Sequence, residues 1–377
     1  RLAVTGGLPA RMGEVQIWDV AVPDGGIEKL KPRLLLSVPV TFDTIYGGSW
    51  SPDGRLIAFG CGDNSLRAID AESGEQVLFQ GAHTDWVRDT VFSQDGTKLV
   101  SVSRDMTVKL TEVATERFID NITSITPGAL KGGVNSVALH PSRDEIVIGG
   151  ADGVPKVYRL ERLTDRRIGD DANLIRKMPA IHGRIFSVAV SDNGKRFAAS
   201  GSLDGVGEIG IYAYEFDTSL PDDVKKIMAK AVGQRSAEEQ QRVAEYQVEG
   251  VRQVAKTDVP QAGVFAIDFH PDSKVLAAAG GDGVIRLVDV ESGSVLRQFA
   301  AAPLGQAETQ QVSNASQPVL ARSLPTIRPA EHEELTLPEG VVVNRLEVNP
   351  QRLAFHRSID YAQLLVTAEL DNGDRID

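Results

Sequence analysis

The residues best able to bind a metal ion or a haem group are sparse in this chain of 377 residues. Cys61 is the only cysteine, so the Cys-x-x-Cys spacing of zinc and haem sites does not occur. No two histidines have the spacing of metal ligands on one helix face. The sequence therefore predicts neither a metal site nor a cofactor. The six histidines stand at positions 83, 140, 182, 270, 332 and 356.

Three glycine- and aspartate-rich segments have the composition of ligand-binding loops. Gly201–Gly205 and Gly280–Gly283 are predicted to be turns and not phosphate loops, because no helix pattern follows either of them. Asp371–Asp374 resembles the start of a calcium loop but lacks the closing glutamate, so it is also predicted to be a turn. No Gly-x-Ser-x-Gly motif occurs, and no pattern among the 52 acidic residues pairs two of them in a pocket. The chain is predicted not to be an enzyme.

A four-residue turn motif recurs along the chain. Its copies begin at Ser51, Ser93, His140, Ser191 and His270, at intervals of 42, 47, 51 and 79 residues. Each copy lies between short apolar runs rich in β-branched residues, and the glycine in several copies tolerates a positive φ. The two histidines that replace serine are expected to hydrogen-bond within their turns. Strands on both sides of a turn, repeated at this interval, predict an all-β propeller.

The copy that begins at Ser93 shows how the elements of one repeat follow each other. Two short apolar runs flank the motif, and a tight turn at Asp105 leads to a further strand. Four antiparallel strands make one blade of a propeller. The four strands of this repeat are expected at 87–92, 98–103, 107–111 and 117–122.

These repeats resemble the WD-repeat family over residues 1–300. The clearest match is Val15–Val20, in which Trp-Asp stands at the end of the third strand as it does in the family. In the family, a turn aspartate accepts hydrogen bonds from a histidine and from its own turn. His83 and Ser101 could complete this network in the third repeat, although Thr111 replaces the family's tryptophan. The matching turn aspartates are Asp63, Asp105, Asp152, Asp204 and Asp282.

The resemblance implies six blades, of which the first is incomplete. Residues 2–5 and 14–20 correspond to a second and a third strand, and the sequence has neither a first strand before them nor an initiator methionine. WD-repeat propellers usually have seven blades, so a fragment or a processed chain of a longer protein is expected. An upstream blade or a strand from the tail is expected to close the ring, because proteins normally protect open strand edges.

Residues 219–247 interrupt the fifth blade with helical features. Ser219 is expected to cap a first helix. Ser236 opens a Ser-Ala-Glu-Glu capping box, which predicts a second helix to about residue 247. A helical hairpin is therefore expected between the third and fourth strands of this blade, either as a decoration of the rim or as a docking element. The apolar face of its first helix comprises Val224, Ile227, Met228 and Ala231.

The tail departs from the repeat. Residues 301–342 are rich in Ala, Gln, Ser and Pro and predict a linker. Residues 343–377 resemble the start of a bacterial Ig-like domain of group 2, on Leu346–Pro350 and Tyr361–Ala368. The resemblance is to the version found in large planctomycete multidomain proteins of the cytochrome type, and it implies a periplasmic or cell-envelope location. Strands are expected at 341–348, 353–356 and 363–370.

Charge and hydropathy narrow the classes of partner. A net charge of −12 argues against nucleic-acid binding, which needs a positive field. No apolar run is long enough to span a membrane. Cys61 lies in an apolar run and is predicted to be a buried, inert thiol. The expected partners are proteins or neighbouring domains of the same chain.

The resemblance also implies where a partner binds. WD-repeat proteins mostly bind partners on the top face, at positions before each first strand and before each turn aspartate. Aromatic and arginine side chains, which are enriched in interaction hot spots, occupy several of these positions here. The alternative is that Phe186 and Phe265 pack between blades. The predicted partner-binding residues are Tyr46, Trp86, Arg88, Arg104, Arg184, Phe186 and Phe265.

The sequence thus predicts a non-catalytic interaction or scaffold module of a larger multidomain envelope protein. Two alternatives stay open. One is a propeller that forms part of a redox or hydrolytic enzyme whose catalytic domain lies outside this sequence, which an upstream Cys-x-x-Cys-His motif would favour. The other is a propeller that is itself an enzyme, which a metal or cofactor retained on purification would favour.

Overall fold

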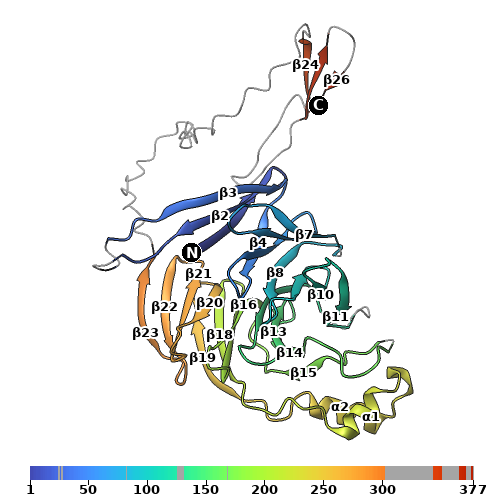
Figure 1. Cartoon of the computed structure of the whole chain (residues 1–377). Helices are drawn as coiled ribbons and strands as arrows, with labels where there is room; N and C mark the ends of the chain where they lie inside the picture. Colours follow the sequence, from blue (N-terminus) through green and yellow to red (C-terminus); the bar gives the residue numbers. More distant parts are fainter. Residues whose placement is uncertain are drawn as a thin grey trace, which may run out of the picture. The chain divides into compact units, whose positions relative to one another are not determined.

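The computed structural model describes residues 1–23, 26, 29–81, 83–124, 131–167, 169–301, 343–349, 365–370 and 375–376. The chain divides into two compact units, Arg1–Gln306 and Ala307–Asp377. Among the described residues, the first unit contains six antiparallel sheets, five of four strands and one of three. The sheets follow one another in sequence order, from blue to orange in Figure 1. This is the all-β propeller that the repeats predict.

In each sheet the strands are hydrogen-bonded in chain order. The first sheet contains β1 (Leu2–Leu8), β2 (Met12–Asp19) and β3 (Arg33–Thr41). The second contains β4 (Ile45–Trp50), β5 (Leu56–Cys61), β6 (Leu66–Asp70) and β7 (Gln76–Gln80). The third contains β8 (Val87–Phe92), β9 (Lys98–Ser103), β10 (Val108–Glu112) and β11 (Phe118–Asn121).

The remaining three sheets have the same plan. The fourth contains β12 (Val134–Leu139), β13 (Glu145–Gly150), β14 (Lys156–Arg159) and β15 (Leu174–Lys177). The fifth contains β16 (Arg184–Val190), β17 (Arg196–Leu203), β18 (Val206–Ala213) and β19 (Gln253–Val259). The sixth contains β20 (Val264–Phe269), β21 (Val275–Gly280), β22 (Val284–Asp289) and β23 (Val295–Ala300).

The three-stranded sheet lacks an innermost strand, as the sequence predicts. The first strands of neighbouring four-stranded sheets contact each other in turn, from β4 through β8, β12 and β16 to β20. β1 packs against β4 in the way that β5 packs against β8, so β1 has the position of a second strand. β2 ends with Trp18 and Asp19, which is the third-strand ending of the repeat.

Five apolar clusters fill the interfaces between successive sheets. Because side chains alternate along a strand, Ile146 and Ile148 of β13 pack toward the third sheet while Val147 packs toward the fifth. Both faces of an inner sheet are therefore buried, which explains why β13 is apolar or glycine at every position after Glu145.

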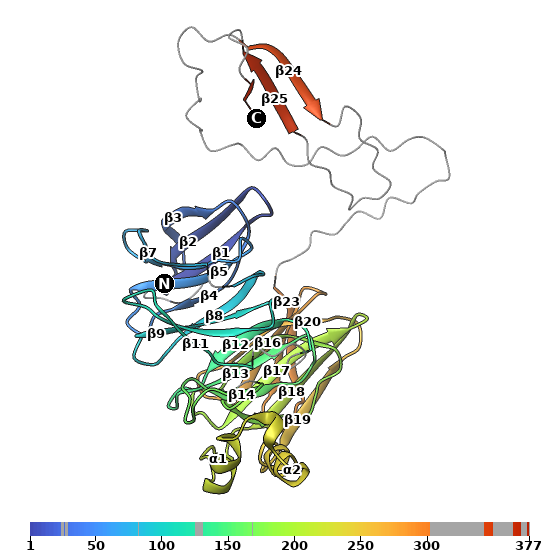
Figure 2. The ribbon, with the colours of Figure 1, turned by 90° about the vertical axis from the view of Figure 1, so that its right-hand side faces the viewer.

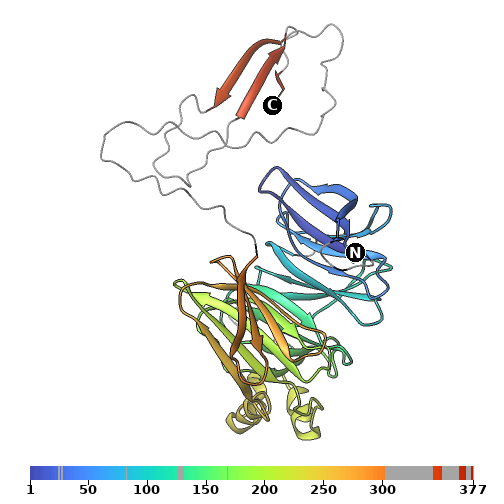
Figure 3. The ribbon, with the colours of Figure 1, turned by 90° about the vertical axis from the view of Figure 1, so that its left-hand side faces the viewer.

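The outward faces of the first and sixth sheets, which Figure 3 shows in blue and orange, keep exposed apolar side chains. Leu2 is 49 % exposed, Val4 44 % and Phe299 42 %. An apolar sheet face of this kind normally packs against a further sheet. Closure of the ring by an upstream blade or by the tail stays a prediction.

Polar side chains on the first strands connect neighbouring sheets. The Asp89 carboxylate on β8 accepts hydrogen bonds from Ser136 Oγ and from the Val137 N–H of β12, both at 3.0 Å. Its other oxygen accepts from the Thr90 N–H at 2.9 Å. Burial raises the pKa of Asp89 to about 6, and these three hydrogen bonds only partly offset the effect.

This carboxyl predicts a pH dependence of stability. The pKa of Asp89 is higher in the folded chain than the ordinary value of 3.8, so the folded state binds its proton more tightly. The stabilisation is full below about pH 4 and is lost as the pH rises through about 6. We expect the free energy of unfolding of the wild type, relative to Asp89→Asn, to fall by roughly 2 kcal/mol across this range. Urea unfolding of both proteins at several pH values tests this, and a constant difference would contradict it.

The recurring turn motif is built from local hydrogen bonds. Ser51 Oγ donates to Asp53 Oδ1 at 2.6 Å and accepts from the Leu56 N–H at 2.8 Å. In the copies with histidine, Nδ1 of His140 and of His270 accepts a backbone N–H from two residues later, at 3.1 and 3.3 Å. Both histidines thus hydrogen-bond within their turns, as expected, although the N–H they accept is two residues later instead of five.

A helical hairpin separates β18 from β19, and Figure 2 shows it at one end of the sheets. It consists of α1 (Asp222–Met228), the short 3-10 helix η2 (Val232–Gln234) and α2 (Ala237–Tyr246). Ser236 and Glu239 form the capping box of α2. The expectation that Ser219 caps α1 is wrong. Pro221 occupies the cap position without a side-chain bond, and Ser219 Oγ instead donates to Asp217 at 2.8 Å.

The second unit contains one three-stranded antiparallel sheet among its described residues. Its strands are β24 (Val343–Asn349), β25 (Leu365–Leu370) and β26 (Arg375–Ile376). The predicted linker after residue 301, the predicted strand at 353–356 and the turn at Asp371–Asp374 lie outside the described residues. The assignment of this unit to an Ig-like domain stays a prediction.

Candidate functional site

The upper end of the first unit, as defined here, is the end at which the first strands begin and the second strands turn into the third. At this end a backbone hydrogen bond recurs: the residue before the turn aspartate donates its N–H to the residue before the first strand. The Arg104 N–H donates to the Trp86 carbonyl at 3.0 Å. The Gly281 N–H donates to the Gly263 carbonyl at 2.9 Å in the sixth sheet. The repeat therefore brings residues from two distant loops together on one surface.

Four of the predicted partner-binding residues form one cluster, the Trp86 cluster. The Trp86 ring lies 5.8 Å from the Tyr46 ring, measured between centroids. The Arg104 guanidinium lies 4.7 Å from the centroid of the Trp86 ring. The guanidinium of Arg88, a residue of β8, lies 5.2 Å from the same centroid. Arg88 also lies 5.4 Å from the Tyr46 ring. The indole thus contacts two cations, and because Trp86 remains 36 % exposed it is still open to a partner.

Asp85 anchors this cluster, and sequence reasoning missed it. Its carboxylate pairs with the Arg104 guanidinium at 3.0 Å and accepts the Trp86 N–H at 2.8 Å. Ser103 Oγ donates to the Asp85 carbonyl at 2.9 Å. One acidic residue therefore pairs with the arginine side chain and bonds the backbone N–H of the tryptophan. Its position directly before Trp86 was the available signal in the sequence.

Arg88 differs from Arg104 because it has no acidic partner. Its Nε is buried without a hydrogen-bond partner, and none of its donors bonds to another described residue. Burial lowers the pKa of Arg88, and the charges of Arg104 and Arg184 lower it further, while the nearby Tyr46 phenol and the Asp85 carboxylate offset part of this effect. The guanidinium is thus a partly desolvated cation that forms no hydrogen bond to another described residue.

The other three predicted residues lie around a second feature, the Phe cavity. Phe186 and Phe265 meet edge to face, with centroids 5.0 Å apart, and Phe265 is 49 % exposed. They line a cavity of about 640 Å³ at the upper end together with Arg184. The sequence left open that Phe186 and Phe265 are both packed between blades. This alternative does not hold for Phe265, because its side chain is half exposed and lines the cavity. The remaining lining residues are Ala151, Asp152, Ile181, Gly183, Ser202, Leu203, Asp204, Gly205 and Gly263.

The turn aspartates show a feature that the sequence analysis did not recognise. In the second, fourth and sixth sheets the aspartate pairs with a cation four residues later. Asp63 and Arg67 are 2.6 Å apart, and the other two pairs are Asp152 with Lys156 and Asp282 with Arg286. A lysine or arginine at this spacing therefore replaces the histidine of the WD-repeat network.

The third sheet keeps the histidine network. His83 Nδ1 lies 2.9 Å from Asp105 Oδ2, and His83 Nε2 lies 2.8 Å from Ser101 Oγ. Serine, histidine and aspartate in this order are also the parts of a hydrolytic triad. Ser101 is 1 % exposed and His83 5 %, so a substrate carbonyl cannot reach the serine oxygen. The arrangement is structural.

The described residues offer little other chemistry. Within them, no group of three or more His, Cys, Asp or Glu side chains could hold a metal ion. Cys61 is buried, as predicted, and burial raises the pKa of its thiol to about 12, which disfavours the reactive thiolate. None of the described helices has the length and apolar character needed to cross a membrane.

At the lower end, opposite the Trp86 cluster, two buried arginines of the fourth sheet fasten the helical hairpin. Arg159 Nη2 donates to Tyr246 Oη at 3.0 Å. The Arg176 guanidinium stacks 4.5 Å from the Tyr246 ring and donates to the carbonyls of Glu249 and Asp217 at 2.7 and 2.8 Å. The hairpin belongs to the fifth sheet in sequence but is held by the fourth.

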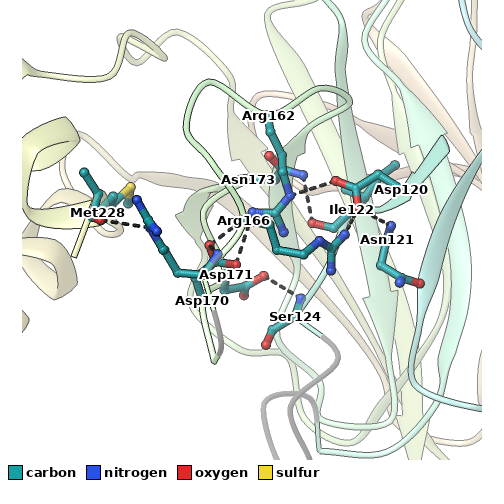
Figure 4. Close-up of polar contacts among 12 residues, drawn as sticks. Asp120, Asn121, Ile122, Ser124, Arg162, Arg166, Asp170, Asp171, Asn173 and Met228 are labelled. Carbon is teal, nitrogen blue, oxygen red and sulfur yellow. Dashed lines mark hydrogen bonds and ion pairs between the residues drawn. The ribbon is translucent and has the colours of Figure 1, made fainter. Parts of the chain in front are cut away.

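A second polar network, shown in Figure 4, supports this end. Arg162 donates to Asp120 of the third sheet at 2.7 Å and to both oxygens of Asp170 at 3.1 Å. The Ser124 N–H donates to Asp171 Oδ1 at 2.9 Å. The segment between β14 and β15 thus ties the third sheet to the fourth. The sequence analysis did not anticipate a structured role for it.

Two family models match parts of the chain. The WD domain, G-beta repeat, matches residues 74–111, and the anaphase-promoting complex subunit 4 WD40 domain matches residues 236–309. The chain therefore contains WD40 repeats. Together with the six antiparallel sheets, these matches identify the fold as a WD-repeat β-propeller.

Among curated proteins, the chain is similar to eukaryotic translation initiation factor 3 subunit I. It is 27 % identical over 197 residues to the protein of Nematostella vectensis, covering 50 % of this chain and 57 % of the relative. It is 28 % identical over 198 residues to that of Drosophila willistoni, covering 51 % and 59 %. It is 29 % identical over 200 residues to that of Taeniopygia guttata, covering 51 % and 57 %. The chain thus spans little more than half the length of these relatives.

Proposed function

We propose that this chain is a non-catalytic protein-interaction module of a multi-protein assembly, with its binding surface at the upper end. The observation that carries the proposal is the Trp86 cluster, in which an exposed indole lies between Arg88 and Arg104. Tryptophan, tyrosine and arginine are the residues most enriched in interface hot spots. Asp85 pairs with Arg104, which restricts this side chain and reduces the side-chain entropy that it loses when a partner binds.

The similarities support an assembly role. One matching family model is named for a subunit of the anaphase-promoting complex, and the curated relatives are named as a subunit of a translation initiation factor. Both names describe proteins that work as parts of larger assemblies. We extend this role to the present chain and leave the identity of its assembly to experiment.

We also propose that residues 343–377 begin an Ig-like domain of a larger multidomain envelope protein. The resemblance of this segment to that domain and the antiparallel pairing of β24 with β25 support the proposal. The complete open reading frame would test it directly. A frame that encodes no signal peptide and ends shortly after Asp377 would contradict it.

Removal of two side chains of the Trp86 cluster is expected to weaken partner binding without unfolding the chain. We expect Trp86→Ala combined with Arg104→Ala to weaken binding by about 2 kcal/mol or more, roughly 30-fold. The measurement is affinity capture from the native lysate, followed by calorimetric titration of each purified partner against both proteins. Thermal unfolding of the variant checks that the fold is retained.

The third sheet offers a matched control on its outer strand. Arg117→Ala combined with Phe118→Ala removes an arginine and an aromatic ring that are also exposed, but far from the upper end in the sheet. This variant is expected to bind every partner like the wild type. If the Trp86 variant keeps all partners at wild-type affinity, the binding surface lies elsewhere, and the helical hairpin becomes the next candidate.

A further inference from the structure

We infer that the upper end binds a short acidic protein segment, with a carboxylate on Arg88 and an adjacent apolar side chain in the Phe cavity. The inference rests on the proposed function and deepens it, because it states the chemistry of the partner segment. It combines the Trp86 cluster and the Phe cavity into one binding site with two subsites.

The anionic subsite follows from the unpaired cations. The side chains of Arg88 and Arg184 have no hydrogen bond or ion pair with another described residue, and the side chain of Arg104 has an ion pair with Asp85. Arg88 presents a planar guanidinium, stacked on Tyr46 and Trp86, with its Nε buried and unbonded. A carboxylate matches this fork with two parallel hydrogen bonds. In a chain of net charge −12, three gathered arginines form a local site for an anion.

The apolar subsite follows from the Phe cavity. Phe265 is 49 % exposed and Leu203 43 %, and both line the cavity with the ring of Phe186. A volume of about 640 Å³ accommodates one large side chain together with part of its backbone. Arg184 and Phe186 of this cavity lie on β16, Arg88 lies on β8, and β12 contacts both of these strands. The two subsites are therefore neighbours, which suits adjacent residues of one peptide.

The acidic residues of the rim argue against a polyanion. Asp152 and Asp204 line the Phe cavity, and Asp85 stands beside Arg104. A continuous phosphate backbone would meet these carboxylates, whereas a single carboxylate on Arg88 need not. A basic segment is disfavoured by the arginines themselves. The chemistry that fits is one or two carboxylates followed by a leucine or an aromatic residue.

The test uses defined peptides and the whole chain. The probe is the peptide Gly-Ser-Asp-Glu-Leu-Phe-Gly, labelled with fluorescein at its N-terminus and amidated at its C-terminus, and its binding is titrated by fluorescence anisotropy. We expect a version in which Asn-Gln replaces Asp-Glu, the Asn-Gln peptide, to bind about 10-fold more weakly. Arg88→Met should produce the same loss for the acidic peptide and no further loss for the Asn-Gln peptide. Phe265→Ala should weaken binding of the Leu-Phe peptide but leave a Gly-Gly version unchanged.

Controls separate this inference from the proposed function. Arg117 is an exposed arginine outside the site, and the Arg117→Met variant should bind every peptide like the wild type. If Arg88→Met does not fold, Arg184→Met provides a second variant within the site. Equal affinity for the acidic and Asn-Gln peptides, or about 10-fold tighter binding of a phosphoserine version, would overturn the carboxylate assignment. In that case, a lysate partner that still depends on Trp86 would leave the proposed function standing.

Discussion

We expect Asp105→Ala to lower the free energy of unfolding by about 3–5 kcal/mol, because it leaves a buried histidine network without its acceptor. The Asp105 carboxylate accepts from His83 Nδ1 at 2.9 Å, from the Thr84 N–H at 3.0 Å and from Thr107 Oγ1 at 2.7 Å. The His83 side chain is 1 % exposed, so water cannot replace these bonds without opening the sheet. Urea unfolding followed by tryptophan fluorescence measures the loss.

The same carboxylate predicts an acid-labile contribution. Burial alone would raise the pKa of Asp105, but the hydrogen bond and charge of His83, with bonds from Thr107 and Thr84, hold it well below 3.8. A depressed pKa stabilises the folded state above the unfolded value and loses this effect as the pH falls below it. The difference between the wild type and Asp105→Ala should therefore shrink on acidification below about pH 4.

Asp282 provides a matched control for this prediction. It is the turn aspartate of the sixth sheet, its side chain is 26 % exposed, and its partner is Arg286 instead of a histidine. Asp282→Ala is expected to cost about 1 kcal/mol or less, because exposed ion pairs contribute little. Equal losses for the two variants would show that the histidine network adds nothing beyond an ordinary turn aspartate.

We expect Tyr246→Ala to destabilise the chain by about 3–5 kcal/mol, because it removes a fully buried ring that the fourth sheet holds. Tyr246 is 1 % exposed and packs with Val224, Met228 and Val243 in the core of the hairpin. Its loss also strips Arg159 of the Tyr246 hydroxyl. Tyr246→Phe keeps the ring and should cost about 1 kcal/mol. Urea unfolding and hydrogen exchange of α1 and α2 measure the two effects.

The outcome decides between the two interpretations of the insertion. If Tyr246→Ala removes protection only from α1 and α2 and leaves the unfolding midpoint unchanged, the hairpin is a decoration that melts independently. A lowered midpoint means that the hairpin supports the fourth and fifth sheets. Val248→Ala, at a site that is 55 % exposed just after α2, should have no effect and serves as the control.

The elements were predictable from the sequence because their determinants are close together in the chain. The turn at Ser51 is made by hydrogen bonds among residues 51–56, and the capping box joins Ser236 to Glu239. The strand pattern follows from apolar residues buried on both faces of each sheet. The wrong prediction of a helix cap at Ser219 also has a local cause. Asp217, two residues earlier, accepts hydrogen bonds from both the hydroxyl and the backbone N–H of Ser219.

The contacts that make the candidate site depend on residues far apart in the chain. The sequence predicted that seven residues would share the upper end, by alignment of the repeats. It did not predict that they divide into the Trp86 cluster and the Phe cavity, or that Asp85 pairs with Arg104 while Arg88 Nε has no hydrogen bond. Side-chain pairing of this kind depends on rotamers and on the few atoms within hydrogen-bonding distance, which an alignment of repeats does not specify.

The sequence by itself determined the repeating strands, the turns and the existence of the hairpin, because each of these is settled by interactions within a few residues. Only the tertiary structure decided which sheet holds the hairpin and which arginines stand free. Arg176 reaches Tyr246 across 70 residues, and Arg88 and Arg184 influence each other across 96, because the rotation of successive sheets about one axis brings them together. That rotation is set by the apolar packing between sheets, which is a property of the whole assembly of blades.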